Sequence, residues 1–278
     1  MELSHEQLNA VQQVELKLFR EFLQVCQTLK LRYYVVGGTL LGAVRHKGFI
    51  PWDDDIDVGM PREDYEVLLK KGQALLPAWC FLQTFETDPQ FPANFAKLRD
   101  SRTTFVETAL RNRAINHGIY IDIFPLDHYP EEAKAARRLK RKNFFLEGRV
   151  ADACYCENKL PLKTRVRRAV CRLLHPCLTA ALQSREQLFR EVPPTGTLAN
   201  HCGAWGDKEI MPAHWFGDGC QLPFEGLSVC APKDYDRYLS QLYGDYMVPP
   251  PPEKRVAHHY VDVIDLQTSY QNYLGNKT

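Results

Sequence analysis

The stretch that decides the fold of this chain reads Pro51-Trp52-Asp53-Asp54-Asp55-Ile56-Asp57-Val58, with four carboxylates in five residues. These side chains repel one another, so a chain keeps them between apolar residues only where a positive group compensates them. If the stretch is extended, Asp53, Asp55 and Asp57 share one face, because successive side chains of a strand alternate. Three carboxylates on one strand face are typical of a site for a hard divalent cation such as Mg²⁺.

A Gly37-Gly38 pair precedes the acidic stretch, at the junction between a predicted strand and a predicted helix. Bare backbone N–H groups at such a junction are suited to binding a phosphate group. Carboxylates for a metal beside a cradle for a phosphate together indicate an enzyme that transfers a phosphorylated group.

Composition narrows the class of protein further. The chain has 278 residues, a hydrophobic fraction of 45% and a formal charge of +1, which indicate a soluble globular protein without a global attraction to nucleic acid. The first residues do not resemble a secretory leader, and no apolar run reaches the length of a transmembrane helix. We therefore expect a cytoplasmic protein, with its nine cysteines as reduced thiols.

Hydrophobic periodicity predicts alternating helices and strands. A capping box formed by Ser4 and Gln7 opens an amphipathic helix that ends near Leu29, and further helices are predicted over residues 39–46 and from Pro61 onward. Strand patterns occupy residues 32–36, 53–58, 80–85, 95–99, 103–107 and 118–124. Asp122 projects from the last of these strands between apolar neighbours. A buried lone carboxylate is costly unless it is paired or binds a metal.

The segment over residues 131–191 is predicted to be helical and is strongly basic. Between Lys134 and Arg172 it has thirteen Lys and Arg residues against three Asp and Glu residues, a local net charge of +10. The plain interpretation is the solvated face of two helices. The functional interpretation is a patch that binds anionic lipid headgroups. No recognised RNA-binding module accompanies the charge, so we expect no nucleic acid partner.

The block from Gly37 to Asp57 resembles the signature of the LicD family. That family comprises phosphocholine transferases of bacterial surface glycans, with fukutin and the fukutin-related protein as distant relatives. The resemblance continues in several shorter blocks, at residues 95–101, 118–127, 224–226, 243–247 and 251–258. These blocks are distributed from about residue 33 to about residue 260, nearly the whole chain, and the basic segment has none of them.

The resemblance implies an α/β (α+β), nucleotidyltransferase-like fold. Its parts are a mixed sheet with flanking helices, a Gly-Gly turn, an Asp-x-Asp strand and a third acid on a neighbouring strand. In this sequence Gly37-Gly38, Asp55 with Asp57, and Asp122 take those roles. The chain would then be a single catalytic domain over residues 1–278, divided into a core (30–128), a basic helical insertion (130–192) and a C-terminal part that completes the site (193–278).

The resemblance also implies the reaction. It would be metal-dependent transfer of a phospho-alcohol group, first of all phosphocholine from CDP-choline, to a hydroxyl of a cell-surface glycan or its lipid-linked precursor. The protein would work in the cytoplasm, with peripheral contact at the anionic inner face of the membrane.

The residue pattern and the resemblance together give the candidate site residues. Asp53, Asp55, Asp57 and Asp122 are the predicted ligands of Mg²⁺ or Mn²⁺. Asp55, Asp57 and Asp122 are the predicted catalytic residues, and Asp122 can accept the proton of the attacking hydroxyl. The predicted substrate-binding residues are Gly37, Gly38, Thr39, Arg45, His46, Lys47, Lys97, Arg99 and His258. Asp53 has a second interpretation, as a group that orients Arg45 or His46.

Two alternatives stay open. One is a nucleotidyltransferase that transfers AMP or UMP from a nucleoside triphosphate, and the other is a non-catalytic module that binds nucleotide or glycan. A choline donor makes a further demand, because proteins recognise quaternary ammonium groups with aromatic faces. At least two of the candidate aromatic residues should then line a pocket beside Asp55 and Asp57. The candidates are Trp52, Tyr120, Trp205, Trp215, Tyr246 and Tyr260.

Overall fold

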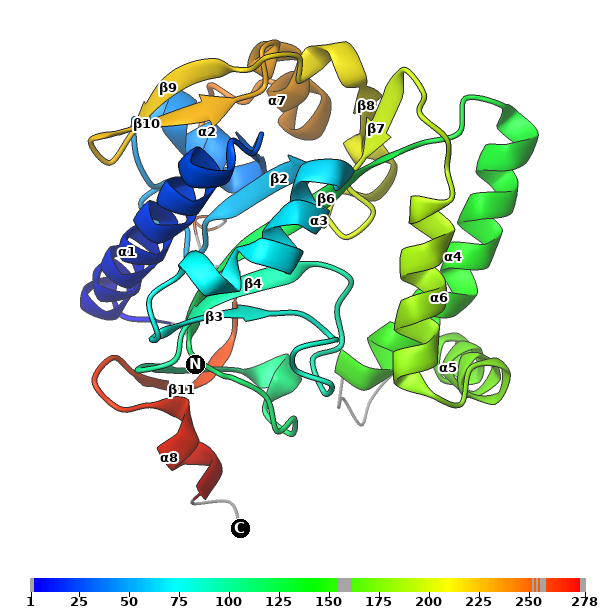
Figure 1. The fold of residues 1–278 in the computed structure, drawn as a ribbon, viewed down its shortest axis with the longest axis horizontal. Coiled ribbons are helices and arrows are strands. Elements are labelled where there is room, and N and C mark those ends of the chain that lie inside the picture. Colours follow the sequence, from blue (N-terminus) through cyan, green and yellow to red (C-terminus); the bar gives the residue numbers. More distant parts are fainter. Residues whose placement is uncertain (1–2, 155–161, 252, 254, 256–258, 276–278) are drawn as a thin grey trace.

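A mixed β-sheet forms the centre of the molecule (Figure 1). The computed structural model describes residues 3–154, 162–251, 253, 255 and 259–275. Within these residues the sheet has the order β1-β2-β6-β4-β3, and β7 pairs with β6 and with β8. Only β2 and β6 pair in parallel, while the other neighbours in this sheet are antiparallel. The predicted α/β (α+β) class with a mixed sheet is confirmed.

The strands of this sheet are short except for β6. They are β1 (Tyr34–Val35), β2 (Asp57–Pro61), β3 (Cys80–Gln83), β4 (Ala96–Asp100), β6 (Ile119–His128), β7 (Thr197–Ala199) and β8 (Ile210–Pro212). Two further pairs lie outside the sheet: β5 (Thr104–Glu107) with β11 (Val261–Asp265), and β9 (Cys220–Phe224) with β10 (Leu227–Ala231). Strand β11, near the end of the chain, therefore pairs with a strand that lies much earlier in the sequence.

Helices surround the sheet in two groups (Figure 1). Those close to the sheet are α1 (His5–Leu29), α2 (Gly37–Arg45), α3 (Arg62–Lys71) and α7 (Tyr235–Tyr243). The others are α4 (Ala133–Cys154), α5 (Leu162–Leu174) and α6 (Leu178–Arg190), which pack on one another to one side, and the short α8 (Tyr270–Gly275). None of the described helices is long and apolar enough to cross a membrane.

Helix α1 has the predicted bounds because its capping box forms: the Ser4 hydroxyl accepts from the Gln7 N–H, and the Gln7 side chain accepts from the Ser4 N–H. Its apolar stripe packs on β4 and β6, with Leu18, Phe19 and Phe22 almost fully buried. Full burial of one such side chain contributes about 2 kcal/mol. The helix therefore holds the sheet from one side.

Two boundaries near the glycines and the acids differ from the prediction. Helix α2 begins at Gly37 rather than at residue 39, so the glycines form its first turn. Strand β2 begins only at Asp57, and residues 53–56 are irregular. The Asp53 N–H donates to the carbonyl of Ile50, which keeps the chain in a turn just before the strand. This irregular segment is called the acidic loop below.

Candidate active site

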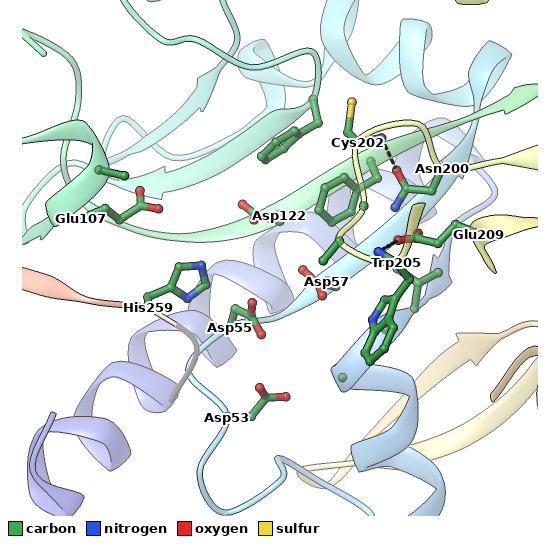
Figure 2. Close-up of a pocket in the computed structure, with 18 of the residues that line it drawn as sticks. Asp53, Asp55, Asp57, Glu107, Asp122, Asn200, Cys202, Trp205, Glu209 and His259 are labelled. Atoms are coloured by element: carbon green, nitrogen blue, oxygen red, sulfur yellow. Dashed lines mark hydrogen bonds between the residues drawn. The ribbon is translucent and has the colours of Figure 1, made fainter. Parts of the chain in front are cut away.

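A cavity of about 1270 Å³ opens beside the acidic loop and the start of β2 (Figure 2). Its walls are rich in carboxylates, which come from five separate segments of the chain. They are Asp53, Asp55, Asp57, Glu107, Asp122, Glu209 and Asp262. Asp53, Asp55 and Asp57 all line it, as the alternation of side chains predicted, although only Asp57 belongs to a strand.

Asp57 and Asp122 lie side by side because β2 and β6 pair in parallel, with these two residues in register. The Asp122 N–H donates to the carbonyl of Ile56 on the β6 side, and the Val36 N–H donates to the carbonyl of Asp57 on the β1 side. The Asp57 N–H donates to the Thr39 hydroxyl at 2.8 Å. Thr39 therefore positions Asp57 from below the cavity and does not itself line it.

The glycine pair leaves space for two of the acids, a steric role that was not predicted from the sequence. A Cβ atom on Gly38 would lie 2.5 Å from Oδ2 of Asp53, and one on Gly37 would lie 2.9 Å from Oδ2 of Asp57. Gly37 also has a φ of +54°, in the left-handed region that favours glycine. Both glycines line the cavity, and the first turn of α2 thus makes room for two of the acids. A role in phosphate binding stays a prediction.

Lys97 compensates part of this negative charge. It is in register with Asp122 across the antiparallel β4–β6 pair, and its Nζ lies 3.2 Å from Oδ1 of Asp122 and 3.5 Å from Oε1 of Glu107. The ammonium also lies 3.2 Å from the centroid of the Tyr120 ring. Lys97 was predicted to hold phosphate. Instead its side chain is buried against two carboxylates and does not line the cavity.

Burial and the neighbouring charges shift the pKa values of these acids in different directions. Burial alone would raise the pKa of Glu107, but Lys97 and Arg99 lower it to about 2. For Asp122, burial raises the pKa to about 6 in spite of Lys97. Burial and the neighbouring carboxylates also raise the pKa values of Asp53 and Asp57 strongly. The carboxylates of the cavity wall therefore repel one another when they are ionised, and a bound cation would reduce this repulsion.

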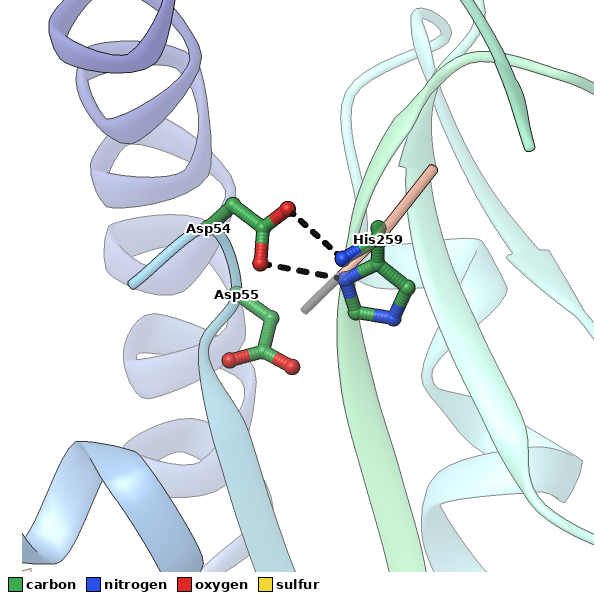
Figure 3. Close-up of side chains that lie close together, drawn as sticks. All are labelled: Asp54, Asp55 and His259. Atoms are coloured by element: carbon green, nitrogen blue, oxygen red, sulfur yellow. Dashed lines mark hydrogen bonds and ion pairs between the residues drawn. The ribbon is translucent and has the colours of Figure 1, made fainter. Parts of the chain in front are cut away.

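Asp54 does not line the cavity, and its carboxylate points toward His259 (Figure 3). The His259 Nδ1 lies 3.2 Å from Oδ1 of Asp54, and the backbone N–H of His259 donates to Oδ2 at 3.1 Å. Burial would lower the pKa of His259, but the bond to Asp54 and the charge of Asp55 raise it to about 9. In the described part of the chain, Asp54, Asp55 and His259 are the group of metal-ligand side chains that lie closest together, within 4.8 Å.

The predicted basic phosphate ligands do not gather in the cavity. Arg99 is fully buried, where it bonds to Gln83, to the carbonyl of Gly118 and, at 3.5 Å, to Glu107. No part of it reaches solvent and it does not line the cavity, so the structure gives its predicted role in substrate binding no support. Arg45 lies outside the cavity lining and donates to the carbonyl of Tyr246 at 3.0 Å.

His46 and Lys47 are exposed at the end of α2, also outside the lining. His258 lies outside the described residues. Its neighbour His259 does line the cavity.

Several residues that line the cavity belong to no motif that would predict them from the sequence. Glu107 ends β5, Tyr238 lies on α7, and Asn200 and Glu209 lie on the loop segments around β7 and β8. No motif marks them, and the tertiary fold alone brings them to the acids. The aromatic prediction fares better, since Trp205 and Tyr260 line the cavity, whereas Tyr120 is buried beneath Lys97.

Comparison with known proteins agrees with this geometry. Residues 30–165 match the family described as LicD/FKTN/FKRP, nucleotidyltransferase domain. The chain is 32% identical to the lipopolysaccharide cholinephosphotransferase LicD of Haemophilus influenzae over 267 residues, which cover 91% of this chain and 96% of that protein. The chain belongs to the LicD family.

Other known proteins are similar to this chain over shorter stretches. The ribitol 5-phosphate transferase FKRP of human and mouse is 50% identical over 40 residues, 14% of this chain and 8% of FKRP. An uncharacterized protein of Rickettsia prowazekii, RP689, is 37% identical over 101 residues, 36% of this chain and 34% of that protein. In this LicD-family chain the matched range 30–165 holds the glycine pair and five of the cavity acids, while other lining residues, such as Trp205, Tyr238 and His259, come from beyond it.

Proposed function

We propose that this LicD-family chain transfers a phospho-alcohol group, with phosphocholine as the first candidate, from a CDP-linked donor to a hydroxyl of a cell-surface glycan or its lipid-linked precursor. One observation carries the proposal: Asp57 and Asp122 stand in register on adjacent strands and face one cavity together with Asp53 and Asp55. Similarity along nearly the full length to a protein named lipopolysaccharide cholinephosphotransferase supports the choice of group and acceptor.

The residues present fit a divalent cation. Asp55, Asp57 and Asp122 would hold Mg²⁺ or Mn²⁺, with Asp53 as a further ligand, because crowded carboxylates with raised pKa values gain from a shared cation. The ion would neutralise phosphate oxygens of the donor and so stabilise charge that develops during transfer. The group of Asp54, Asp55 and His259 is a less suitable metal site, because both carboxylate oxygens of Asp54 are already hydrogen-bonded to His259.

Side chains and backbone groups of the protein would carry out the proton transfer and bind the donor. Asp122, whose pKa of about 6 is close to neutrality, would accept the proton of the attacking hydroxyl. Lys97 holds that carboxylate in place and balances its charge. His259, positively charged at neutral pH, would face a phosphate oxygen of the donor from the cavity wall. The first turn of α2 would direct the N–H groups of Gly38 and Thr39 to the diphosphate, while the Gly37 N–H donates to the Tyr238 hydroxyl.

The aromatic part of the cavity lining suits a quaternary ammonium. It consists of the rings of Phe95, Phe124, Trp205, Tyr238 and Tyr260. Trp205 packs edge-on against Tyr243, with ring centroids 4.9 Å apart, which limits its orientation. A choline group gains by contact with such ring faces and by the nearby carboxylates, whereas a polyol has no comparable preference.

A donor competition tests the proposal. The purified chain is incubated with Mg²⁺ and CDP-choline, CDP-glycerol, CDP-ribitol or ATP. Both the thermal shift and the product released are measured. The proposal expects the largest Mg²⁺-dependent shift with CDP-choline, and release of CMP when glycan acceptor is added. Pyrophosphate release from ATP would favour AMP transfer instead, and binding of donors without turnover would favour the non-catalytic module.

The proposal includes the organisation of the chain. Residues 30–128 form the core of a single catalytic domain over residues 1–278, residues 130–192 are a basic helical insertion, and residues 193–278 complete the site. Support comes from the cavity lining, to which Trp205, Tyr238 and His259 contribute from the last part. The reaction would take place in the cytoplasm, at the anionic inner face of a membrane, where a lipid-linked acceptor is anchored.

A further inference from the structure

Helix α5 has an apolar face that points to solvent. Leu173 is 82% exposed and Leu162 is 73% exposed, and Val166, Val170 and Leu174 are also largely exposed. At about 100° per residue these five positions fall on one side of the helix. Amphipathic helices of globular proteins normally turn this side toward the core. In α5 the apolar side faces solvent instead.

The opposite side of α5 makes the contacts with the protein. Cys171 is fully buried, and its Sγ lies where α4 has Gly148, so close that a Cβ on this glycine would be 2.5 Å away. Arg167 reaches α4 as well, where it stacks on the Phe144 ring at 4.0 Å and donates to its carbonyl at 3.2 Å. The helix is thus held in this orientation by contacts that leave its apolar side outward.

Basic side chains border the exposed apolar face. The thirteen residues of α5 include five Lys and Arg residues and no acid. Lys163, Arg165 and Arg172 are exposed. Arg172 is paired with Asp152 at 2.7 Å, while Lys163 and Arg165 extend the positive charge beside Leu162 and Val166. The face therefore combines exposed aliphatic side chains with positive charge along its edges.

No other part of the described chain has such a concentration. Of the eleven large hydrophobic side chains that are exposed there, five lie on α5. The rest are scattered over other elements, as Leu75 and Met247 are, and scattered exposed residues are ordinary. A stripe of this kind on a helix requires a partner.

We infer that α5 docks this protein on an anionic membrane surface, with Leu162, Val166 and Leu173 inserted below the headgroups and the flanking Lys and Arg side chains among anionic lipid phosphates. The charge selects this occupant. A second copy of the chain would bring two equally positive helices together, whereas an anionic bilayer offers apolar depth and negative charge at once. The inference deepens the membrane contact named in the proposed function and does not depend on the chemistry at the acids.

Vesicle co-sedimentation with the full chain tests this inference. The vesicles consist of phosphatidylcholine alone, or contain about a third phosphatidylglycerol, enough to make the surface strongly negative. We expect binding to the anionic vesicles, little binding to the neutral ones, and a steep loss of binding when salt is raised. The double variant Leu162→Ser/Leu173→Ser should lower partitioning by at least about tenfold, because it removes the inserted side chains.

Matched variants separate the two components. Lys163→Glu/Arg165→Glu should abolish the preference for anionic vesicles, and Leu75→Ser, which changes an exposed leucine elsewhere, should bind as the parent does. Equal binding to neutral and anionic vesicles, or an unchanged Leu162→Ser/Leu173→Ser variant, would overturn the inference. Concentration-dependent dimers that this variant abolishes would assign the face to a second copy. Each variant is also assayed for transfer to a soluble acceptor, so that failure of docking and failure of the proposed chemistry are distinguished.

Discussion

His259 binds Asp54 with both its ring and its backbone, across a separation of 205 residues in the sequence. The Asp54 carboxylate is almost fully buried, and the imidazolium is a partner that offsets the cost of burying this charge. The pair ties the segment leading into β11 to the acidic loop. It also explains why one acid in a run of three consecutive aspartates faces away from the cavity.

Removing this partner should destabilise the protein. In His259→Ala the Asp54 carboxylate stays buried without its cation, which we expect to cost about 3 kcal/mol of the free energy of unfolding. Denaturant titration measures the change, and His214→Ala, at an exposed histidine, is the control. A loss of less than roughly 0.5 kcal/mol would contradict a structural role for the pair.

Asp57→Asn should reduce transfer by at least roughly a hundredfold, because it removes a charge that stabilises the transferred phosphoryl group and its cation. The fold should survive, since one of several crowded carboxylates is neutralised; the melting temperature without metal should stay the same or rise. Transfer assays and thermal melting are carried out together. Full activity of the parent protein in EDTA would rule out the metal mechanism.

Gly38→Ala should lower activity, because the new methyl group would lie 2.5 Å from Oδ2 of Asp53 and would force the carboxylate or the helix to move. Gly275→Ala, where nothing lies within 4 Å of the added Cβ, is the matched control. The kcat of transfer and the apparent affinity for Mg²⁺ are compared. If Gly38→Ala retained both, the steric relation between the glycine pair and the acids would have no bearing on function.

Trp205→Leu tests the choline contact. If the ring faces the quaternary ammonium, CDP-choline binding should weaken by about 0.5–2 kcal/mol while CMP binding is unchanged. Calorimetric titration in the presence of Mg²⁺ measures both ligands. An equal loss for CMP would mean that the tryptophan supports the cavity wall or the nucleotide instead.

His201 makes stability depend on pH. Its ring stacks on Phe189 with centroids 3.9 Å apart, and burial together with Arg185 lowers its pKa to about 3. The folded state thus binds fewer protons than the unfolded state below pH 6.5. Stability is full above that pH and falls as the pH drops toward 3, by at most about 1.4 kcal/mol per pH unit.

The His201→Phe variant should remove this dependence, since phenylalanine keeps the stack and the Nε2 atom has no hydrogen-bond partner to lose. Denaturant midpoints of the parent and the variant are compared between pH 7 and pH 4, where the two curves should diverge. Parallel curves would show that the histidine is protonated without cost in the folded protein.

The local features of this chain were readable from the sequence because short-range physics sets them. The capping box predicted where α1 begins, and alternation predicted that Asp53, Asp55 and Asp57 share a side. Asp122 stood out as a lone acid between apolar residues. The family resemblance supplied the role of a third acid on a neighbouring strand, and strand register then brought Asp122 next to Asp57.

The sequence by itself determined the class of fold, the family, and the identity of the clustered acids, since these depend on residue type and spacing along one segment. Only the tertiary structure decided which charges meet. Arg99 and Lys97 read equally well as phosphate ligands, yet strand pairing buries both of them against carboxylates. Glu107 and His259 carried no motif and reach the cavity through the β5–β11 pair. Pairing between distant strands is set by packing of the whole core, which no local pattern specifies.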